Sequence, residues 1–131
     1  MSLALPPLAP VLALPTAPLP DPGASLLVRV DVATGLLTAT GELDHCSAHL
    51  VLEAVHPLAL GTAPAWLVDA GAVTFCDGGG LAALLGVRTA ALEHGRPLHL
   101  VGAARCVRRL IALTGLDDVL AVVPRPARGT G

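Results

Sequence analysis

The sequence predicts a single α/β domain, in which three or more helices pack on a mixed sheet of four to five strands. First, apolar residues alternate with Arg29 and Asp31 across residues 26–32, a pattern typical of a half-buried strand. Second, the apolar run at residues 64–69 predicts a strand that is buried on both faces. Third, a helical pattern separates this run from a further apolar strand at residues 97–101, which requires parallel pairing through a right-handed crossover.

The residues before the buried strand predict a hairpin and one helix. A turn at residues 33–35 leads to a second strand at residues 36–42, and so short a connection favours antiparallel pairing. Asp44 is a suitable N-cap, because its carboxylate can accept hydrogen bonds from the free N–H groups of the first helical turn. Pro57 is expected to end or kink this helix, since proline lacks an N–H donor. The apolar stripe of the helix recurs at spacings of three and four: Leu50, Val51, Ala54, Val55 and Leu58.

The second half of the chain alternates helices with apolar strands. Gly95 and Gly115 each follow a helical pattern, and glycine is the residue that most often ends a helix. The predicted elements are a loop at 70–80, a helix at 81–93, the strand at 97–101, a helix at 105–114 and a last strand at 120–123.

Proline marks the limits of the folded domain. Residues 1–25 hold seven of the twelve prolines, a density that favours polyproline II and predicts a disordered or loosely docked tail. Residues 124–131 are expected to form a flexible C-terminal tail, which leaves residues 26–123 as the domain. The mean hydropathy of +0.72 raises the question of membrane insertion. The prolines make the long uncharged stretch at 1–20 a poor spanning helix, so no membrane insertion is expected.

Charge and cysteine usage exclude other classes. The net charge is −2, and without a basic stripe or an aromatic ladder we expect no nucleic-acid partner. Cys46, Cys76 and Cys106 are odd in number and widely spaced, which favours reduced thiols in the cytoplasm. No cofactor is expected, because neither Lys nor Ser/Thr follows the glycines at 78–80 as it would in a phosphate-binding loop.

Two small groups of residues offer the chemistry of an enzyme. His45 and His49 are four residues apart and therefore share a helix face, as metal ligands do, but a solvated polar face is the favoured explanation and no third ligand follows. Cys76 lies beside Asp77, but a nucleophilic thiol needs a base, and the sequence places no histidine there. We therefore predict neither a metal site nor catalytic residues.

The loop that ends in three consecutive glycines is the most informative segment. Gly78, Gly79 and Gly80 present bare backbone N–H groups at a helix N-terminus, which suits a bound anion or a docked partner. A tight turn capped by Asp77 is the alternative. The apolar residues of the following helix exceed one buried stripe, which is consistent either with partner docking or with apolar residues filling exposed positions.

Three motifs in order carry a family resemblance: Gly-Glu-Leu-Asp at 41–44, the segment 68–81 and Leu-Thr-Gly-Leu-Asp at 113–117. Over residues 26–123 the sequence resembles the STAS domain, and more narrowly the anti-sigma-factor antagonists of bacteria. The resemblance implies a STAS-type fold and a non-enzymatic module that binds a kinase-type anti-sigma factor and so frees a sigma factor. It leaves open a STAS subunit of another assembly, such as a lipid-transport ABC complex or a stress-signalling scaffold. A small thiol or metal enzyme using Cys76 or His45 and His49 is a more distant alternative.

The resemblance also assigns residues. In such antagonists the loop reads Asp-Ser-Ser-Gly or Asp-Ser-Thr-Gly, and the anti-sigma factor phosphorylates the first hydroxyl residue. Asp77 and Gly80 match this pattern, whereas Gly78 stands at the phosphorylated position and has no oxygen to accept phosphate. The resemblance therefore implies that switching by phosphorylation is lost. The protein is expected to be a monomer or a weak dimer. The expected partner-binding residues are Asp44, His45, Asp77, Gly78, Gly79, Gly80, Leu81 and Leu84.

Overall fold

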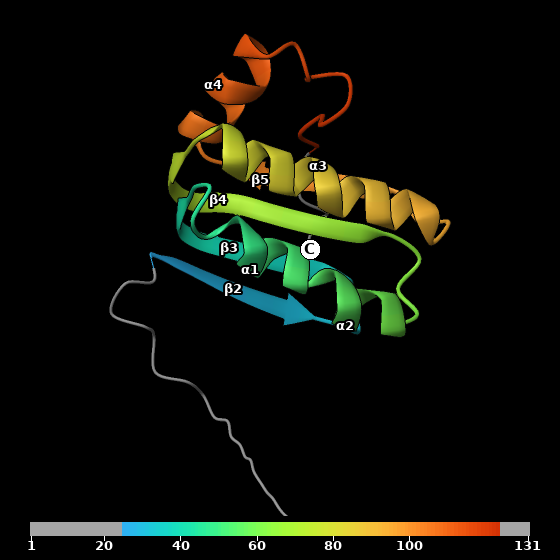
Figure 1. Ribbon diagram of the computed structural model, residues 1–131. Coiled ribbons are helices and arrows are strands. Elements are labelled where there is room, and N and C mark those ends of the chain that lie inside the picture. The colour runs from blue at the N-terminus through green and yellow to red at the C-terminus, as the bar shows by residue number, and fades with distance from the viewer. Residues whose placement is uncertain (1–24, 124–131) are drawn as a thin grey trace, which may run out of the picture.

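A computed structural model describes residues 25–123, and the tails predicted at 1–25 and 124–131 lie outside this range except for Ser25. The domain is one four-stranded sheet in the order β2-β3-β4-β5, with three helices across one face and α4 beyond α3 (Figure 1). β2 pairs antiparallel with β3, and β3, β4 and β5 are parallel. The predicted α/β class and mixed sheet are therefore confirmed. The strands are β2 (Leu26–Asp31), β3 (Leu36–Leu43), β4 (Trp66–Cys76) and β5 (Leu98–Ala103).

The hairpin between β2 and β3 forms as predicted. Gly35 has a φ of +74°, a left-handed conformation that glycine adopts without strain. Asp31 accepts hydrogen bonds from the backbone N–H groups of Ala33 and Thr34, at 3.1 and 3.3 Å, and so fixes the turn. The strands then pair in register from Asp31 with Leu36 to Leu26 with Gly41.

β4 is longer than predicted and the helix expected at 81–93 begins at Gly78, so the loop expected at 70–80 is wrong except at Asp77. β3 continues to Leu43 and offers its parallel edge, on which Phe75 pairs with Glu42 and Cys76 with Leu43. Register shifts interrupt the β3–β4 and β4–β5 pairings, and Asp69 accepts a 2.9 Å hydrogen bond from the Gly71 N–H beside one of them. Only Asp77 then separates the strand from the next helix.

The first predicted helix is two short helices, α1 (Ala48–Glu53) and α2 (Val55–Leu60), which meet at Ala54. Pro57 lies in the first turn of α2 and has no N–H to continue the α1 ladder, so the predicted interruption is confirmed. The N-cap of α1 is Ser47 rather than Asp44, which corrects the sequence prediction. Asp44 instead shapes the turn before the helix.

The remaining helices are α3 (Gly78–Glu93) and α4 (Arg105–Leu113). Residues 120–123 form no full strand, only a parallel bridge between Val122 and Leu100. The core lies between the sheet and the helices and is aliphatic, apart from the fully buried Trp66. Its largest fully buried side chains are Trp66, Leu37, Leu43, Leu58, Leu84, Leu100 and Leu120.

Candidate functional site

The candidate site lies where the parallel strands β3 and β4 end. Leu43 and Cys76 are paired at these ends, so the residues that follow them, Asp44 and Asp77, leave the same edge of the sheet. The Asp77 N–H donates a 3.3 Å hydrogen bond to the Leu43 carbonyl and holds the two connections together. Two segments that are far apart in the sequence therefore form one surface.

Asp77 joins the two segments through its side chain. It is the N-cap of α3, as predicted, and its Oδ1 accepts a 3.0 Å hydrogen bond from the Gly80 N–H. Its Oδ2 accepts from the His45 backbone N–H at 3.3 Å and lies 3.2 Å from the His45 Nδ1. These bonds, chiefly the one from Gly80, hold the pKa of the Asp77 carboxyl below its ordinary value. Asp77 is therefore a fixed negative charge at the start of α3.

Asp44 and Ser47 shape the turn that presents His45. The Asp44 Oδ1 accepts hydrogen bonds from the backbone N–H groups of Cys46 and Ser47, both at 3.0 Å. The buried Ser47 hydroxyl donates to the Glu42 carbonyl at 2.8 Å and accepts from the Asp44 N–H at 3.0 Å. His45 emerges from this turn with its side chain 76% exposed.

The three consecutive glycines have different surroundings. A Cβ at Gly78 would have no atom within 4 Å. A Cβ at Gly79 would lie 2.6 Å from both the Cα and the Cβ of His45, and one at Gly80 would lie 2.2 Å from the Leu43 carbonyl oxygen. The close approach of neighbouring backbone therefore requires glycine at 79 and 80, whereas position 78 has room for a side chain.

Leu81 and Leu84 do not lie on this surface. Their side chains are 4% and 1% exposed and pack in the core, because α3 turns this face toward the sheet. The apolar excess of α3 is exposed at Leu92, near the opposite end of the helix. The expectation that Leu81 and Leu84 contribute side chains to a partner surface is therefore corrected.

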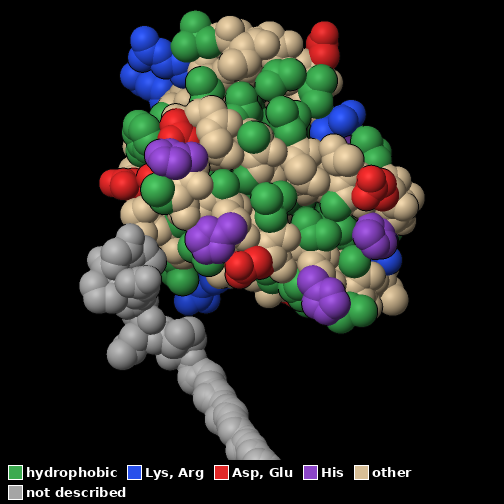
Figure 2. All heavy atoms as spheres, in the orientation of Figure 1, with side chains coloured by type: hydrophobic (Ala, Val, Ile, Leu, Met, Phe, Trp, Pro, Cys, Tyr) green, Lys and Arg blue, Asp and Glu red, His purple; other side chains and the backbone are tan. Residues whose placement is uncertain are grey.

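The structure does not favour the enzyme alternatives drawn from the sequence. Burial, together with the neighbouring Cys106 and Asp77, raises the pKa of the Cys76 thiol to about 11, so Cys76 is a poor nucleophile at neutral pH. Among residues 25–123, no three His, Cys, Asp or Glu side chains are grouped so that they could hold a metal ion. Histidines are scattered over the face that carries α1, α2 and α3, among hydrophobic side chains (Figure 2).

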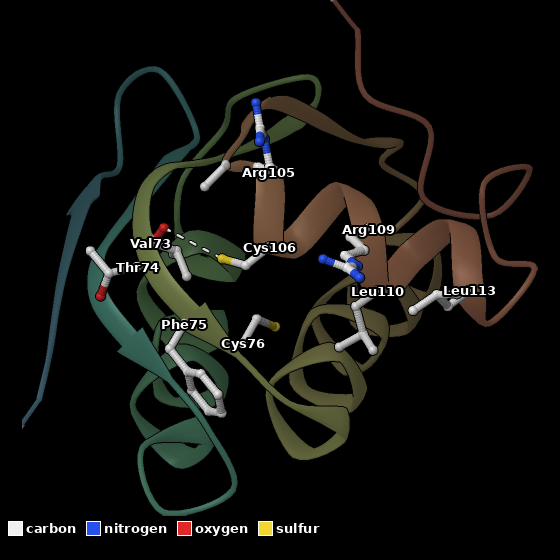
Figure 3. Close-up of a pocket in the computed structure, with 10 residues that line it drawn as sticks. Val73, Thr74, Phe75, Cys76, Arg105, Cys106, Arg109, Leu110 and Leu113 are labelled. Carbon is white, nitrogen blue, oxygen red and sulfur yellow. Dashed lines mark hydrogen bonds between the residues drawn. The ribbon is translucent and has the colours of Figure 1, made fainter.

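A groove between the end of β4 and α4 was missed by the sequence analysis. It has a volume of about 550 Å³, and it is lined by Cys76 of β4 and Cys106 of α4, whose thiol faces the Val73 carbonyl (Figure 3). The signal in the sequence is the alternation of Val73 and Phe75, which lies within the segment predicted as a loop. The remaining walls are formed mainly by Arg105, Arg109, Leu110 and Leu113.

No helix within the described part of the chain is long and apolar enough to cross a membrane.

Three solved structures are similar to this chain. An anti-sigma factor antagonist from Mycobacterium paratuberculosis is 27% identical, with a TM-score of 0.64 over 82% of this chain and 92% of that chain. Unphosphorylated SpoIIAA is 16% identical, with a TM-score of 0.60 over 76% of this chain and 89% of its own. Phosphorylated SpoIIAA from Bacillus is 16% identical, with a TM-score of 0.55 over 76% of this chain and 92% of its own. The two SpoIIAA structures establish likeness of fold only.

Comparison with the sequences of curated proteins gives no match. The family model described as "Mlab, STAS domain" matches residues 26–124, which include all but the first of the residues that the structure describes. Together with the sheet order, the placement of Asp77 and the solved relatives, this match identifies the chain as a member of the STAS domain family.

Proposed function

We propose that this protein is a cytoplasmic, non-enzymatic regulator that binds a kinase-type anti-sigma factor and thereby frees a sigma factor. The 27% identical relative is an anti-sigma factor antagonist, and the match covers 92% of its chain, which supports this class of partner. The surface formed by Asp44, His45, Asp77 and the glycines at 78–80 is the docking edge. It combines the fixed negative charge of Asp77 with the exposed backbone of Gly78, while Gly80 is buried against Leu43 and supports the turn from below.

The observation that carries the proposal is the open position at Gly78. It is the first residue of α3 and directly follows the capping Asp77. A phosphorylated hydroxyl there would bring a charge of about −2 next to the Asp77 carboxylate and would disrupt an interface by repulsion. Glycine offers no oxygen for this reaction, so the protein stays competent to bind the anti-sigma factor. It does so as a monomer or weak dimer.

The test begins with the native partner, recovered by affinity capture on the full chain. The captured partner is incubated with ATP and one of three forms of this protein: wild type, Gly78→Ser or the matched control Gly78→Ala. The mass of each form is then measured by mass spectrometry. We expect no phosphate on wild type or Gly78→Ala, and one phosphate on Gly78→Ser with weaker binding. Space for a side chain at position 78 makes the serine variant a fair test of the missing hydroxyl alone. Stoichiometric phosphate on wild type, for example at the neighbouring Thr74, would refute the proposal.

A second candidate function is a STAS subunit of a different assembly, such as a lipid-transport ABC complex or a stress-signalling scaffold. The family model that matches this chain is named for Mlab and not for an antagonist, which favours keeping this candidate. The same capture experiment separates the two. Recovery of a kinase-type anti-sigma factor supports the first function, and recovery of a transporter ATPase or a scaffold component supports the second.

A further inference from the structure

Cys46 belongs to a chain of three side chains that the sequence analysis did not connect. Its Sγ lies 3.5 Å from the Nε2 of His45, and the Nδ1 of His45 lies 3.2 Å from the Oδ2 of Asp77. A nucleophile, a base and a group that orients the base follow one another in this order in enzymes that activate a thiol or a hydroxyl. Cys46 and His45 are both exposed, so a reagent in solvent can reach them.

The surroundings of His45 set the position of its imidazole. In the tautomer that carries its proton on Nδ1, His45 donates to the Asp77 carboxylate and the lone pair of Nε2 faces the Cys46 thiol. The Gly80 N–H occupies the other Asp77 oxygen, so the carboxylate cannot turn away without uncapping α3. Gly79 allows the His45 backbone to approach closely, since a Cβ at 79 would collide with it. Three contacts therefore hold His45 against Asp77: the Nδ1–Oδ2 contact, the Gly80 N–H on the other carboxylate oxygen, and the close approach at Gly79.

The other two cysteines lack this arrangement. Cys76 and Cys106 are half-buried, and their thiols donate to the backbone carbonyls of Asp77 and Val73, each at 3.6 Å. A carbonyl oxygen cannot take up the thiol proton, whereas an imidazole can. Within residues 25–123, Cys46 is thus the exposed cysteine with a base beside it.

We propose that Cys46 is a reactive thiol that is modified by low-molecular-weight disulfides through thiol–disulfide exchange. The His45 Nε2 takes the proton from Sγ, and the thiolate attacks one sulfur of the disulfide. A new S–S bond forms at Cys46, the original S–S bond breaks, and the departing thiolate takes the proton from the His45 imidazolium. One disulfide is consumed and one is formed, so no separate oxidant is needed. Asp77 acts as a positioning residue for His45.

The modified thiol would lie on the docking edge, and this consequence rests on the proposed function. Cys46 adjoins His45, whose backbone contacts the glycine run at Gly79. A mixed disulfide with glutathione would place a bulky, charged tripeptide there, where phosphate cannot be added to Gly78. Modification of Cys46 would then supply a reversible way to weaken partner binding.

Reactivity is tested on the full chain without any partner. Oxidised glutathione is added to the native protein, and the extent of modification at each cysteine is followed by peptide mass spectrometry. Because the Cys46 thiol is exposed with an imidazole beside it, whereas the Cys106 thiol is half-buried and donates to a carbonyl, we expect Cys46 to react about tenfold faster than Cys106. His45→Ala should lower the Cys46 rate about five- to tenfold relative to wild type, on the same basis.

His49→Ala is the matched control, since it removes an exposed histidine from the same segment and should leave the Cys46 rate unchanged. Asp77→Asn keeps a residue that can cap α3 but removes the charge, and should lower the ratio of the Cys46 rate to the Cys106 rate. This ratio within one molecule is insensitive to a general loss of stability. Equal rates at the two cysteines, or a His45→Ala rate within twofold of wild type, would overturn the proposal.

The regulatory consequence has its own readout. Binding of the captured partner is compared for unmodified protein, protein carrying glutathione at Cys46, and Cys46→Ser treated in the same way. Weaker binding of the modified wild type alone supports the switch, and unchanged binding overturns it. Failure of the unmodified protein to bind an anti-sigma factor would count against the proposed function, and the rates at Cys46 would be unaffected.

Discussion

Alanine substitution of the glycine run should give three graded effects on stability. Gly78→Ala, Gly79→Ala and Gly80→Ala each add one methyl group to the first turn of α3. Alanine is the better helix former by about 1 kcal/mol, so propensity alone predicts that each change stabilises the domain. The surroundings of the three positions predict instead that the sign changes along the run.

The structure gives the size of each effect. At Gly78 the methyl group meets open space, so a gain of about 0.5 kcal/mol from the lower entropy of the unfolded chain should remain. At Gly80 it would lie 2.2 Å from the Leu43 carbonyl oxygen and 2.9 Å from the carbonyl carbon, which belong to fully buried backbone at the end of β3. Overpacking of this kind costs about 3 kcal/mol, which leaves a net loss of about 2 kcal/mol. Gly79→Ala should fall between the two, because the exposed His45 turn can shift.

These free energies of unfolding are measured by urea denaturation at constant pH, with circular dichroism as the probe. For a domain of this size, a loss of about 2 kcal/mol also lowers the midpoint of thermal unfolding by roughly 12 °C. The expected order, from most to least stable, is Gly78→Ala, Gly79→Ala and Gly80→Ala, with the stability of Gly78→Ala at or above that of wild type. If Gly78→Ala and Gly80→Ala agree within about 0.5 kcal/mol, the steric argument is wrong.

Three further predictions concern Asp77, Arg96 and Trp66. The pKa of Asp77 is lower in the folded state, so its contribution is present at neutral pH and lost as the pH falls below about 4; the stability difference between wild type and Asp77→Asn should shrink over that range in acid titrations. Arg96 donates to the Leu58 and Gly61 carbonyls at 3.1 and 2.9 Å, so Arg96→Ala should cost about 2 kcal/mol in urea denaturation and Arg96→Lys should recover only part. Trp66 is fully buried with an indole N–H that lacks a partner, so Trp66→Phe should cost far less than the roughly 4 kcal/mol of Trp66→Ala by the same method.

The fold was largely predictable because periodicity reports burial directly. Alternation in β2 and β3 and the apolar run at the start of β4 gave the strands, and Gly35 marked the turn between the first two. The extension of β4 to Cys76 was not predictable in this way. Its Ala-Gly-Ala segment has little strand propensity, and the strand continues because β3 presents a partner edge more than thirty residues earlier in the chain.

The split between Asp44 and Ser47 shows a second limit of local rules. Both are good N-cap residues, and they stand three positions apart at the start of the same helical pattern. Ser47 occupies the N-cap position, but its hydroxyl caps no N–H of the helix and donates instead to the Glu42 carbonyl at the end of β3. Asp44 then serves the turn before the helix, and this turn aims His45 toward Asp77.

The candidate site was predictable only in part, for the same reason. Asp77 as the cap of α3 follows from the local sequence, but the contact between His45 and Asp77 joins residues 32 positions apart. The resemblance to antagonists brought both residues to one edge, but could not give their hydrogen bonds. Adjacency to Asp77 in the sequence singles out Cys76, whereas the thiol that lies beside an imidazole in the structure is Cys46.

Under the proposed function, the two glycines that replace hydroxyl residues are not equivalent losses. Position 79 is closed by the His45 backbone, so a side chain could return there only if the turn after β3 moved and the contact of His45 with Asp77 were disturbed. Position 78 is open, and nothing in its surroundings prevents a serine. A phosphorylation switch would therefore need one substitution at 78, whereas the glycine at 79 is tied to the placement of His45, and with it to the chemistry of Cys46.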